Sequence, residues 1–305
     1  MARSDAPLGG VTADAVMARA STENFPVASR MLPRRARAHL LAVYGFARLV
    51  DELGDSGPRA RSPKGRVPED EAGERLASLD LLEHDLDRAF AGCAEHPLLV
   101  RLEPTLRECA LPREPFARLI EANRVDQRVN RYQTWEELRG YCALSANPVG
   151  ELVLDVLGHA TPPRIALSDS ICTALQLAEH CQDVPEDMAA GRVYMPAEDL
   201  ERFGCSPAEL RARGPRGRAG TPLRRLLAFE VARARALLAA GEPLIDELRG
   251  RERLAVAAFV AGGRAALDAI ERAGYDVLAG PPRAGHGRRL LALAGTLLGR
   301  RRARP

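Results

Sequence analysis

The stretch LLAVYGFARLVDELGD, from Leu40 to Asp55, decides the fold class of this chain. Its apolar residues recur at spacings of three and four, which predicts an amphipathic α-helix. The stretch ends with Asp51 and Asp55, and residues four apart on a helix lie one above the other, with Cβ atoms about 6 Å apart. The sequence therefore predicts two carboxylates over one spot at the end of this helix.

A second acidic pair ends the stretch ICTALQLAEHCQDVPED, from Ile171 to Asp187. Carboxylates at the C-terminal end of a helix face the negative end of its macrodipole, and in an apolar groove they also lose hydration. Such positions favour bound cations, and Mg²⁺ takes oxygen ligands that it shares between carboxylates and substrate phosphates. Two such clusters facing each other across a cavity would bind a diphosphate through bridging Mg²⁺. The expected metal ligands are Asp51, Asp55, Asp183 and Asp187.

Acidic pairs at this spacing are also common on solvated helices, and a surface position is the alternative interpretation. Glu83 with Asp87 and Glu242 with Asp246 have the same spacing, and no role is assigned to them. The sequence around each pair has to decide between the two interpretations.

Composition places the chain among ordinary soluble globular proteins. Hydrophobic residues make up 46% and charged residues 28% of its 305 residues, which is enough for a large core. The net charge of +3 gives no general case for binding nucleic acid, so no nucleic-acid partner is expected. No run of about 20 apolar residues is present, so no membrane-spanning helix is expected.

The cysteines predict a reducing compartment. The six cysteines show no CxxC or other zinc spacing, and no signal peptide opens the chain, so a cytoplasmic location is expected. His180 stands next to Cys181, but adjacent helical residues point in different directions, so packing is favoured over a soft-metal site.

The fold class predicted from periodicity is all-α, because β-branched runs are scarce and apolar residues recur at helical spacing in nearly every long segment. One helical domain over residues 21–280 is expected, with an N-terminal segment 1–20 before it and a flexible loop over 56–73, where three prolines and three glycines stand. The expected helices cover 12–20, 34–54, 70–91, 114–127, 134–158, 166–184, 222–248 and 253–273.

The C-terminal segment 281–305 is basic and amphipathic. Its apolar run LLALAGTLLG, from Leu290 to Gly299, is flanked by six arginines and no acidic residue. This pattern suits a helix lying on an anionic bilayer surface, which would make the protein peripheral on the inner face of the cell membrane. A last helix packed on the core with a basic end is the alternative, and both stay open.

The segment YGFARLVDELGD resembles the first aspartate-rich motif of the squalene and phytoene synthase family, whose members are all-α head-to-head prenyl synthases. The resemblance covers about residues 20 to 280. QLAEHCQDVPEDMAAGRVYMP resembles the second motif of that family, and DQRVNRYQTWEELRGYCALSANPVG resembles its central helix pair. The positions that match the three motifs are Tyr44, Arg48, Asp51, Asp55, Asp126, Arg131, Tyr132, Tyr141, Asp183, Asp187, Arg192 and Tyr194.

The resemblance implies an isoprenoid synthase bundle with a central active-site cavity, a prenyl diphosphate substrate and Mg²⁺. Within the family, ENFPVAS (Glu23 to Ser29) and SANPVG (Ser145 to Gly150) resemble the bacterial hydroxysqualene synthase branch. That branch implies conversion of presqualene diphosphate and water to hydroxysqualene, in squalene and hopanoid biosynthesis. The residues expected to be catalytic are Tyr44, Arg48, Tyr141 and Asn147, and those expected to bind substrate are Phe25, Arg48, Ser145, Arg192 and Tyr194.

Two positions leave structural alternatives open. Asn147, helped by Ser145, is expected to hold the water that captures the substrate cation, whereas the alternative is that Asn147 caps or kinks the helix before Pro148. Pro185 falls between Asp183 and Asp187, where its missing N–H should kink or end the helix. Asp126, Arg131 and Tyr132 suit either substrate contact or a buried structural network.

Alternative functions also stay open. Within the family, the chain could make presqualene diphosphate or phytoene from prenyl diphosphates. Outside it, a non-catalytic helical scaffold that recruits neighbouring pathway enzymes to the membrane, or a lipid-binding protein using the basic C-terminus, would share the same composition.

Overall fold

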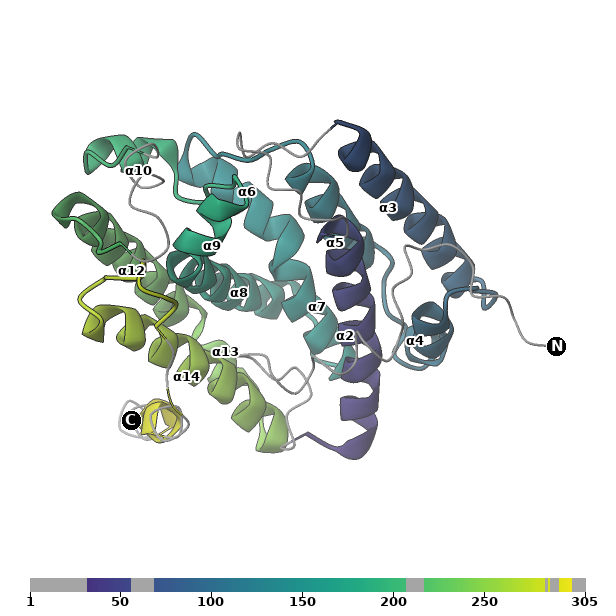
Figure 1. Ribbon diagram of the computed structural model, residues 1–305. Helices are drawn as coiled ribbons and strands as arrows, with labels where there is room; N and C mark the ends of the chain where they lie inside the picture. Colours follow the sequence, from purple (N-terminus) through teal and green to yellow (C-terminus); the bar gives the residue numbers. More distant parts are fainter. Residues whose placement is uncertain (1–31, 56–68, 207–216, 283–284, 286–290, 298–305) are drawn as a thin grey trace. The chain divides into compact units, whose positions relative to one another are not determined.

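The computed structural model describes residues 32–55, 69–206, 217–282, 285 and 291–297, and within them the chain is all-α (Figure 1). This confirms the predicted fold class. The only β feature in these ranges is an isolated parallel bridge between Arg131 and Val193. The helices are α2 (Arg34–Asp55), α3 (Glu69–Phe90), α4 (Pro97–Glu108), α5 (Glu114–Asp126), α6 (Trp135–Ser145), α7 (Asn147–Val156), α8 (Pro162–Gln182), α9 (Val184–Ala189), α10 (Ala197–Arg202), α12 (Thr221–Gly241), α13 (Leu244–Glu247) and α14 (Gly250–Arg272).

Several expected boundaries differ from the observed ones. The helix expected over 134–158 is two helices that meet at Ala146, and the helix expected over 222–248 is α12 followed by α13. The expected loop over 56–73 is helical from Glu69 onward, and its residues 56–68 lie outside the described residues. Pro68 comes directly before this start, and three acidic residues follow it, which favours a helix N-terminus. The helix expected over 12–20 also lies outside the described residues.

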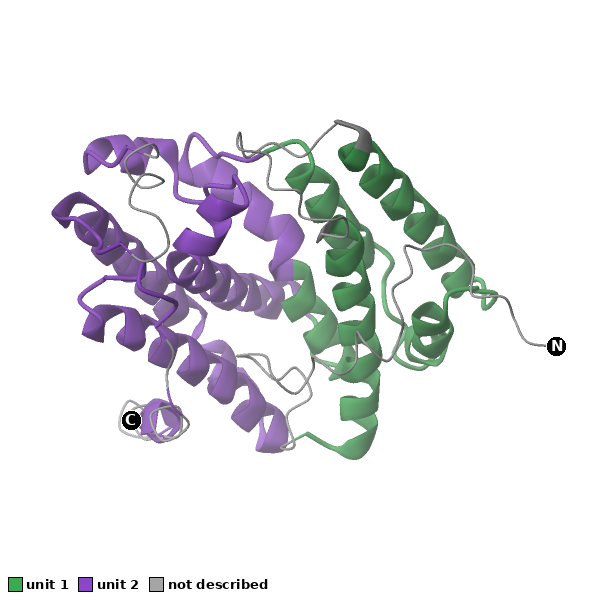
Figure 2. Cartoon of the chain, in the orientation of Figure 1, with its two compact units in different colours: residues 1–62, 66–129, 148–160 green, residues 63–65, 130–147, 161–305 purple. Residues whose placement is uncertain are grey.

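Figure 2 shows two compact units. Unit 1 contains α2 to α5 and α7 from residue 148 onward. Its core forms around Phe46 of α2 and Phe116 of α5, which are fully buried and meet edge to face with ring centroids 5.0 Å apart. Leucines from α2, α3 and α4 complete this core, among them Leu49, Leu53, Leu79, Leu82, Leu86, Leu99 and Leu102. Burial of the apolar face of α2 is what positions Asp51 at its end.

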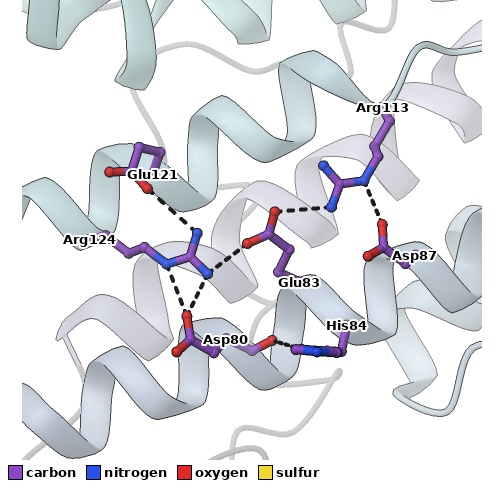
Figure 3. Close-up of polar contacts among 7 residues, drawn as sticks. All are labelled: Asp80, Glu83, His84, Asp87, Arg113, Glu121 and Arg124. Atoms are coloured by element: carbon purple, nitrogen blue, oxygen red, sulfur yellow. Dashed lines mark hydrogen bonds and ion pairs between the residues drawn. The ribbon is translucent and has the colours of Figure 1, made fainter.

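An ion-pair network joins α3 to α5 in unit 1 (Figure 3). Arg113 contacts both Glu83 and Asp87, at 3.0 and 2.5 Å. Arg124 contacts Glu83 at 2.7 Å and Asp80 at 2.6 Å. Burial raises the pKa of Glu83, but hydrogen bonds and positive charge from Arg124 and Arg113 outweigh it, so this pKa is lowered overall. The acidic pair Glu83 and Asp87 therefore has a structural role that its spacing did not indicate.

Unit 2 contains α6, α8 to α10 and α12 to α14, with α8 packed along α12. The two helices approach closely at Gly241, the last residue of α12. A Cβ atom at this position would lie 2.6 Å from the backbone oxygen of Leu167 and 2.5 Å from Cγ1 of Ile171. Because a backbone oxygen cannot move aside as a side chain can, this contact requires glycine.

We expect Gly241→Ala to lower the free energy of unfolding by about 1–3 kcal/mol, the usual cost of overpacking, as measured by urea denaturation. Gly140→Ala is the matched control, because Gly140 is exposed on α6 and nothing lies within 4 Å of a Cβ built there. That control should gain up to about 1 kcal/mol, since alanine favours the helix. Equal stability of Gly241→Ala and the parent would contradict the close contact.

The segment 291–297 is helical and packs on α14. Ala292 lies against Ala265 and Ala269, and Arg264 donates a hydrogen bond of 2.9 Å to the buried Thr296 hydroxyl. Leu291 is 74% exposed. For these seven residues the structure agrees with a packed last helix, and the six flanking arginines lie outside the described residues. Within the described ranges, no helix has the length and apolar character needed to cross a bilayer.

Candidate active site

The first aspartate pair belongs to unit 1 and lies at the end of α2, as its spacing predicts. Tyr44, Arg48, Asp51 and Asp55 follow each other at spacings of four, three and four, which places them on one face of the helix. Tyr44 is buried, whereas the Asp51 side chain is half exposed, with its Oδ2 3.5 Å from Nη1 of Arg48. Asp55 is the last residue of the helix, and its side chain lies outside the described part of the chain.

The second aspartate pair belongs to unit 2 and lies where α8 gives way to α9. α8 ends at Gln182, and Pro185 lies in the first turn of α9, so the proline ends the longer helix as expected. The two aspartates nevertheless stay one turn apart, because the backbone N–H of Asp187 donates to the carbonyl of Asp183 at 2.8 Å. Pro185 therefore changes the helix without separating the pair.

The Gly-Arg-Val-Tyr run forms a tight turn after α9. Gly191 adopts a φ of +80°, a left-handed conformation that favours glycine. This lets the N–H of Arg192 return to the carbonyl of Asp187 at 2.8 Å. The next residue, Val193, donates to the carbonyl of Asn130 at 2.9 Å. The turn thus fixes Arg192 beside the second aspartate pair and directs the chain toward Tyr194.

Tyr194 belongs to a buried aromatic cluster with Tyr132, Tyr141 and His180, all in unit 2. The rings of Tyr194 and His180 are stacked nearly parallel, with centroids 4.0 Å apart. The ring centroid of Tyr141 lies 5.5 Å from that of Tyr194 and 5.4 Å from that of Tyr132. Burial lowers the pKa of His180 to about 3, so its ring is neutral at physiological pH. His180 packs, as expected, and its partners are aromatic.

Arg131 and Tyr132 have separate environments. Arg131 is exposed, while its backbone forms the bridge to Val193. Tyr132 is buried in the aromatic cluster, and Asp126 is half-buried at the end of α5 in unit 1. The structure thus places Tyr132, and not Arg131, in the buried network considered for this segment. Phe25 lies outside the described residues.

Asn147 is the first residue of α7 and lies directly after the break that follows α6. It is buried, and its Oδ1 accepts a hydrogen bond of 3.0 Å from Oγ1 of Thr173 on α8. Pro148 explains the break, because it lacks an N–H and would clash with the carbonyl of Leu144 in a continuous helix. The amide of Asn147 therefore ties the break between α6 and α7 to α8.

A buried charge cluster in unit 2 was not predicted from sequence. Nη1 of Arg233 lies 2.8 Å from Asp199 and 2.8 Å from Glu230, and both carboxylates are buried. The guanidinium also stacks on Trp135, 4.6 Å from the ring centroid. Burial raises the pKa of Glu230 to about 8, with Arg233 opposing this shift and Asp199 adding to it. Glu230 and Arg233 stand three residues apart on α12, a spacing that favours an ion pair on a helix. Arginine is so frequent in this chain that such a spacing alone did not distinguish this pair from others.

Glu230→Gln tests the raised pKa of this buried carboxyl. The folded state holds a proton up to about pH 8, whereas an unfolded glutamate releases it near pH ~4.3, so the parent should lose stability as pH rises between these values. We expect the variant to lack this loss, which amounts to up to about 1.4 kcal/mol per pH unit. Urea denaturation at several pH values measures it, and parallel profiles for the two proteins would contradict the assignment.

The aspartate pairs suit magnesium by their chemistry. Their donors are carboxylate oxygens, which hard divalent cations prefer, and the nearby Arg48 and Arg192 suit a diphosphate anion. Within the described residues, no three His, Cys, Asp or Glu side chains come together as a ready metal site.

Comparison with known proteins gives the family. Residues 18–290 match the family model for squalene/phytoene synthase. The chain belongs to the squalene/phytoene synthase family. A hydroxysqualene synthase of Sinorhizobium fredii is 35% identical over 228 residues, covering 74% of this chain and 72% of that protein. A phytoene synthase of Arthrospira platensis is 33% identical over 272 residues, covering 84% of this chain and 82% of that protein.

Solved structures of this family share the fold. The crystal structure of squalene synthase HpnC from Alicyclobacillus acidocaldarius is 43% identical, with a TM-score of 0.74 over 88% of this chain and 98% of that one. A dehydrosqualene synthase in complex with a ligand matches at a TM-score of 0.78 over 95% and 98%, and its 22% identity shows the fold alone. This squalene/phytoene synthase family member is therefore an isoprenoid-synthesising enzyme of the head-to-head class. Hydroxysqualene and phytoene synthases match at nearly equal identity.

Proposed function

We propose that this enzyme is a hydroxysqualene synthase, a lyase that converts presqualene diphosphate and water to hydroxysqualene and diphosphate. The observation that carries the proposal is the polar pair Ser145 and Asn147, which stand on either side of the break between α6 and α7, with Ser145 one turn beyond the buried Tyr141. An enzyme that ends its reaction with water needs polar groups beside an otherwise apolar reaction site.

The four aspartates are the proposed holders of Mg²⁺ and, through it, of the substrate diphosphate. Bound Mg²⁺ would neutralise the charge that builds on the departing diphosphate. Asp51 and Asp55 contribute from the end of α2, and Asp183 and Asp187 from the α8–α9 junction. Arg48 and Arg192 add fixed positive charge beside the two pairs, which favours loss of the diphosphate with the electron pair of its C–O bond.

The buried aromatic cluster is the proposed support for the carbocation that remains. The faces of Tyr132, Tyr141 and Tyr194 carry partial negative charge, which attracts a cation. The neutral His180 ring adds to the cluster without a repelling charge, because burial lowers the pKa of His180. Tyr44 and Phe25 are proposed to contact the substrate from other segments. Water then forms a new C–O bond to the cation, and the proton it loses passes to the released diphosphate.

Phytoene synthase activity is the second candidate, because phytoene synthases match this chain about as well as hydroxysqualene synthases do. Synthesis of presqualene diphosphate from farnesyl diphosphate belongs to the same class of candidates. Membership of an enzyme family argues against the non-catalytic scaffold considered from sequence. Binding of an anionic membrane or of neighbouring pathway enzymes through the basic C-terminus is a separate proposal.

Parallel incubations of the purified enzyme with Mg²⁺ and one of three diphosphates test the proposal. Presqualene diphosphate should give hydroxysqualene without a nicotinamide cofactor, while farnesyl and geranylgeranyl diphosphate should be left largely unchanged. Formation of phytoene from geranylgeranyl diphosphate, or of presqualene diphosphate from farnesyl diphosphate, with no alcohol from presqualene diphosphate, would contradict it.

A further inference from the structure

In unit 2, α8 contacts α6 through aromatic rings and the first residue of α7 through a hydrogen bond. The rings of Tyr141 and His180 have centroids 6.4 Å apart. Thr173 donates to Asn147 at 3.0 Å. Tyr141 comes before Asn147 in the chain, whereas its partner His180 comes after Thr173. The segment from 141 to 147 and helix α8 therefore run in opposite directions. Ser145 comes between Tyr141 and Asn147 in the chain and is the last residue of α6.

Ser145 carries a polar group on α6 that no contact explains. Its Oγ atom is buried, and no hydrogen-bond partner for it occurs among the residues that the structure describes. Ser145 follows Tyr141 by one helical turn, so both residues lie on the same face of α6. A buried hydroxyl without a partner costs free energy, and an ordered water is the usual partner of such a group.

The neighbouring groups are already engaged. Oδ1 of Asn147 accepts from Thr173, and Nε2 of His180 lies 3.3 Å from the amide nitrogen of Gln176, which donates to it. The His180 ring nitrogen is thus occupied, and its low pKa makes it a poor proton acceptor. Neither Asn147 nor the Nε2 atom of His180 is therefore a free base that would take a proton from a carbocation and give an alkene.

We propose that the Ser145 hydroxyl holds the water molecule that captures the substrate cation, and that Asn147, held by Thr173, is a positioning residue for this site. This inference rests on the proposed function and names the residue that directs its outcome toward alcohol. Oγ accepts a hydrogen bond from the water, which leaves a lone pair of the water oxygen free to bond the cationic carbon. The proton lost from the resulting oxonium passes to the released diphosphate, so the hydroxyl itself is unchanged.

Ser145→Ala tests this assignment through the ratio of hydroxysqualene to total diphosphate released from presqualene diphosphate. We expect this ratio to fall at least about tenfold, a change of about 1.4 kcal/mol in the competition between capture and proton loss, with hydrocarbons replacing the alcohol. Ser145→Thr keeps a hydroxyl and should keep most of the alcohol. Ser170→Ala is the matched control on the exposed side of α8, where Oγ donates to the carbonyl of Ala166, and it should keep the parent ratio.

The outcomes separate this inference from the proposed function. If the parent makes hydroxysqualene and Ser145→Ala makes it in the same ratio, Ser145 does not hold the water, while the proposed function stands. If Ser145→Thr loses the alcohol as fully as Ser145→Ala, the hydroxyl is not the group that matters, and the inference is overturned. If the parent makes no alcohol from presqualene diphosphate, both proposals fail.

Discussion

Asp51→Asn should reduce turnover of presqualene diphosphate by at least about 100-fold, which corresponds to about 2.7 kcal/mol in the barrier. The substitution keeps the shape of the side chain and removes its charge, at a position where α2 ends and where Arg48 already lies 3.5 Å away. In the proposed metal site, loss of one carboxylate would weaken the binding of Mg²⁺ and leave the departing diphosphate less well neutralised. Steady-state release of diphosphate at saturating Mg²⁺ measures the effect.

The matched control is Asp87→Asn, because Asp87 also belongs to an acidic pair at a spacing of four in unit 1. Its carboxylate pairs with Arg113, directly before α5, at 2.5 Å, which is a structural contact. This variant should stay within about threefold of the parent, a difference under about 0.7 kcal/mol. Turnover of Asp51→Asn within the same threefold range would contradict the proposed metal site.

Arg233→Ala should destabilise the fold more than any other single substitution discussed above, by about 3–5 kcal/mol. The arginine contacts Asp199 and Glu230, whose side chains are 5% and 0% exposed. Because Glu230 holds a proton up to about pH 8, the main loss at neutral pH is that Asp199 stays buried without this cation. The substitution also removes the stacking of the guanidinium on Trp135 and Phe229. Chemical denaturation followed by circular dichroism measures the loss.

Arg235→Ala, two residues further along α12, provides the control. Arg235 pairs with Asp268 and Glu271, whose side chains are 49% and 55% exposed, and such solvated pairs contribute about 0–1 kcal/mol. A loss for Arg233→Ala no larger than that of Arg235→Ala would show that the buried cluster is not held by its arginine.

Strong periodicity made the helices that carry the aspartate pairs predictable. The expected helix over 34–54 agrees with α2 to within one residue, because its apolar face is continuous and uninterrupted by proline. The short α4 was not predicted, since Pro97 and Pro104 both stand within it. Pro97 is tolerated in the first turn, where its missing N–H would have no intrahelical partner.

Proline also explains the breaks inside the longer expected helices. α6 ends three residues before Pro148, α8 ends three residues before Pro185, and α12 ends two residues before Pro243. In each case the ring would clash with the carbonyl four residues earlier if the helix continued. The break at Pro185 was predicted, a cap or kink at Asn147 before Pro148 was one of two open interpretations, and the break before Pro243 was not predicted.

The candidate site was predictable only where its residues lie close in sequence. The run from Tyr44 to Asp55 forms one helical face, so spacing alone brings its members together. The cluster of Asp199, Glu230 and Arg233 depends on packing between α10 and α12, and the contact of Asn147 with Thr173 depends on packing against α8. Such contacts join segments that are far apart in sequence, so a pattern of neighbouring residues does not predict them.

The most direct test of the central claim is to incubate the purified enzyme with presqualene diphosphate and Mg²⁺ in water enriched in the heavy oxygen isotope, and to identify the product by mass spectrometry. The proposed function predicts hydroxysqualene that carries one heavy oxygen, formed without a nicotinamide cofactor and in proportion to the diphosphate released. Diphosphate release with only hydrocarbon products, or an alcohol without the heavy isotope, would contradict it.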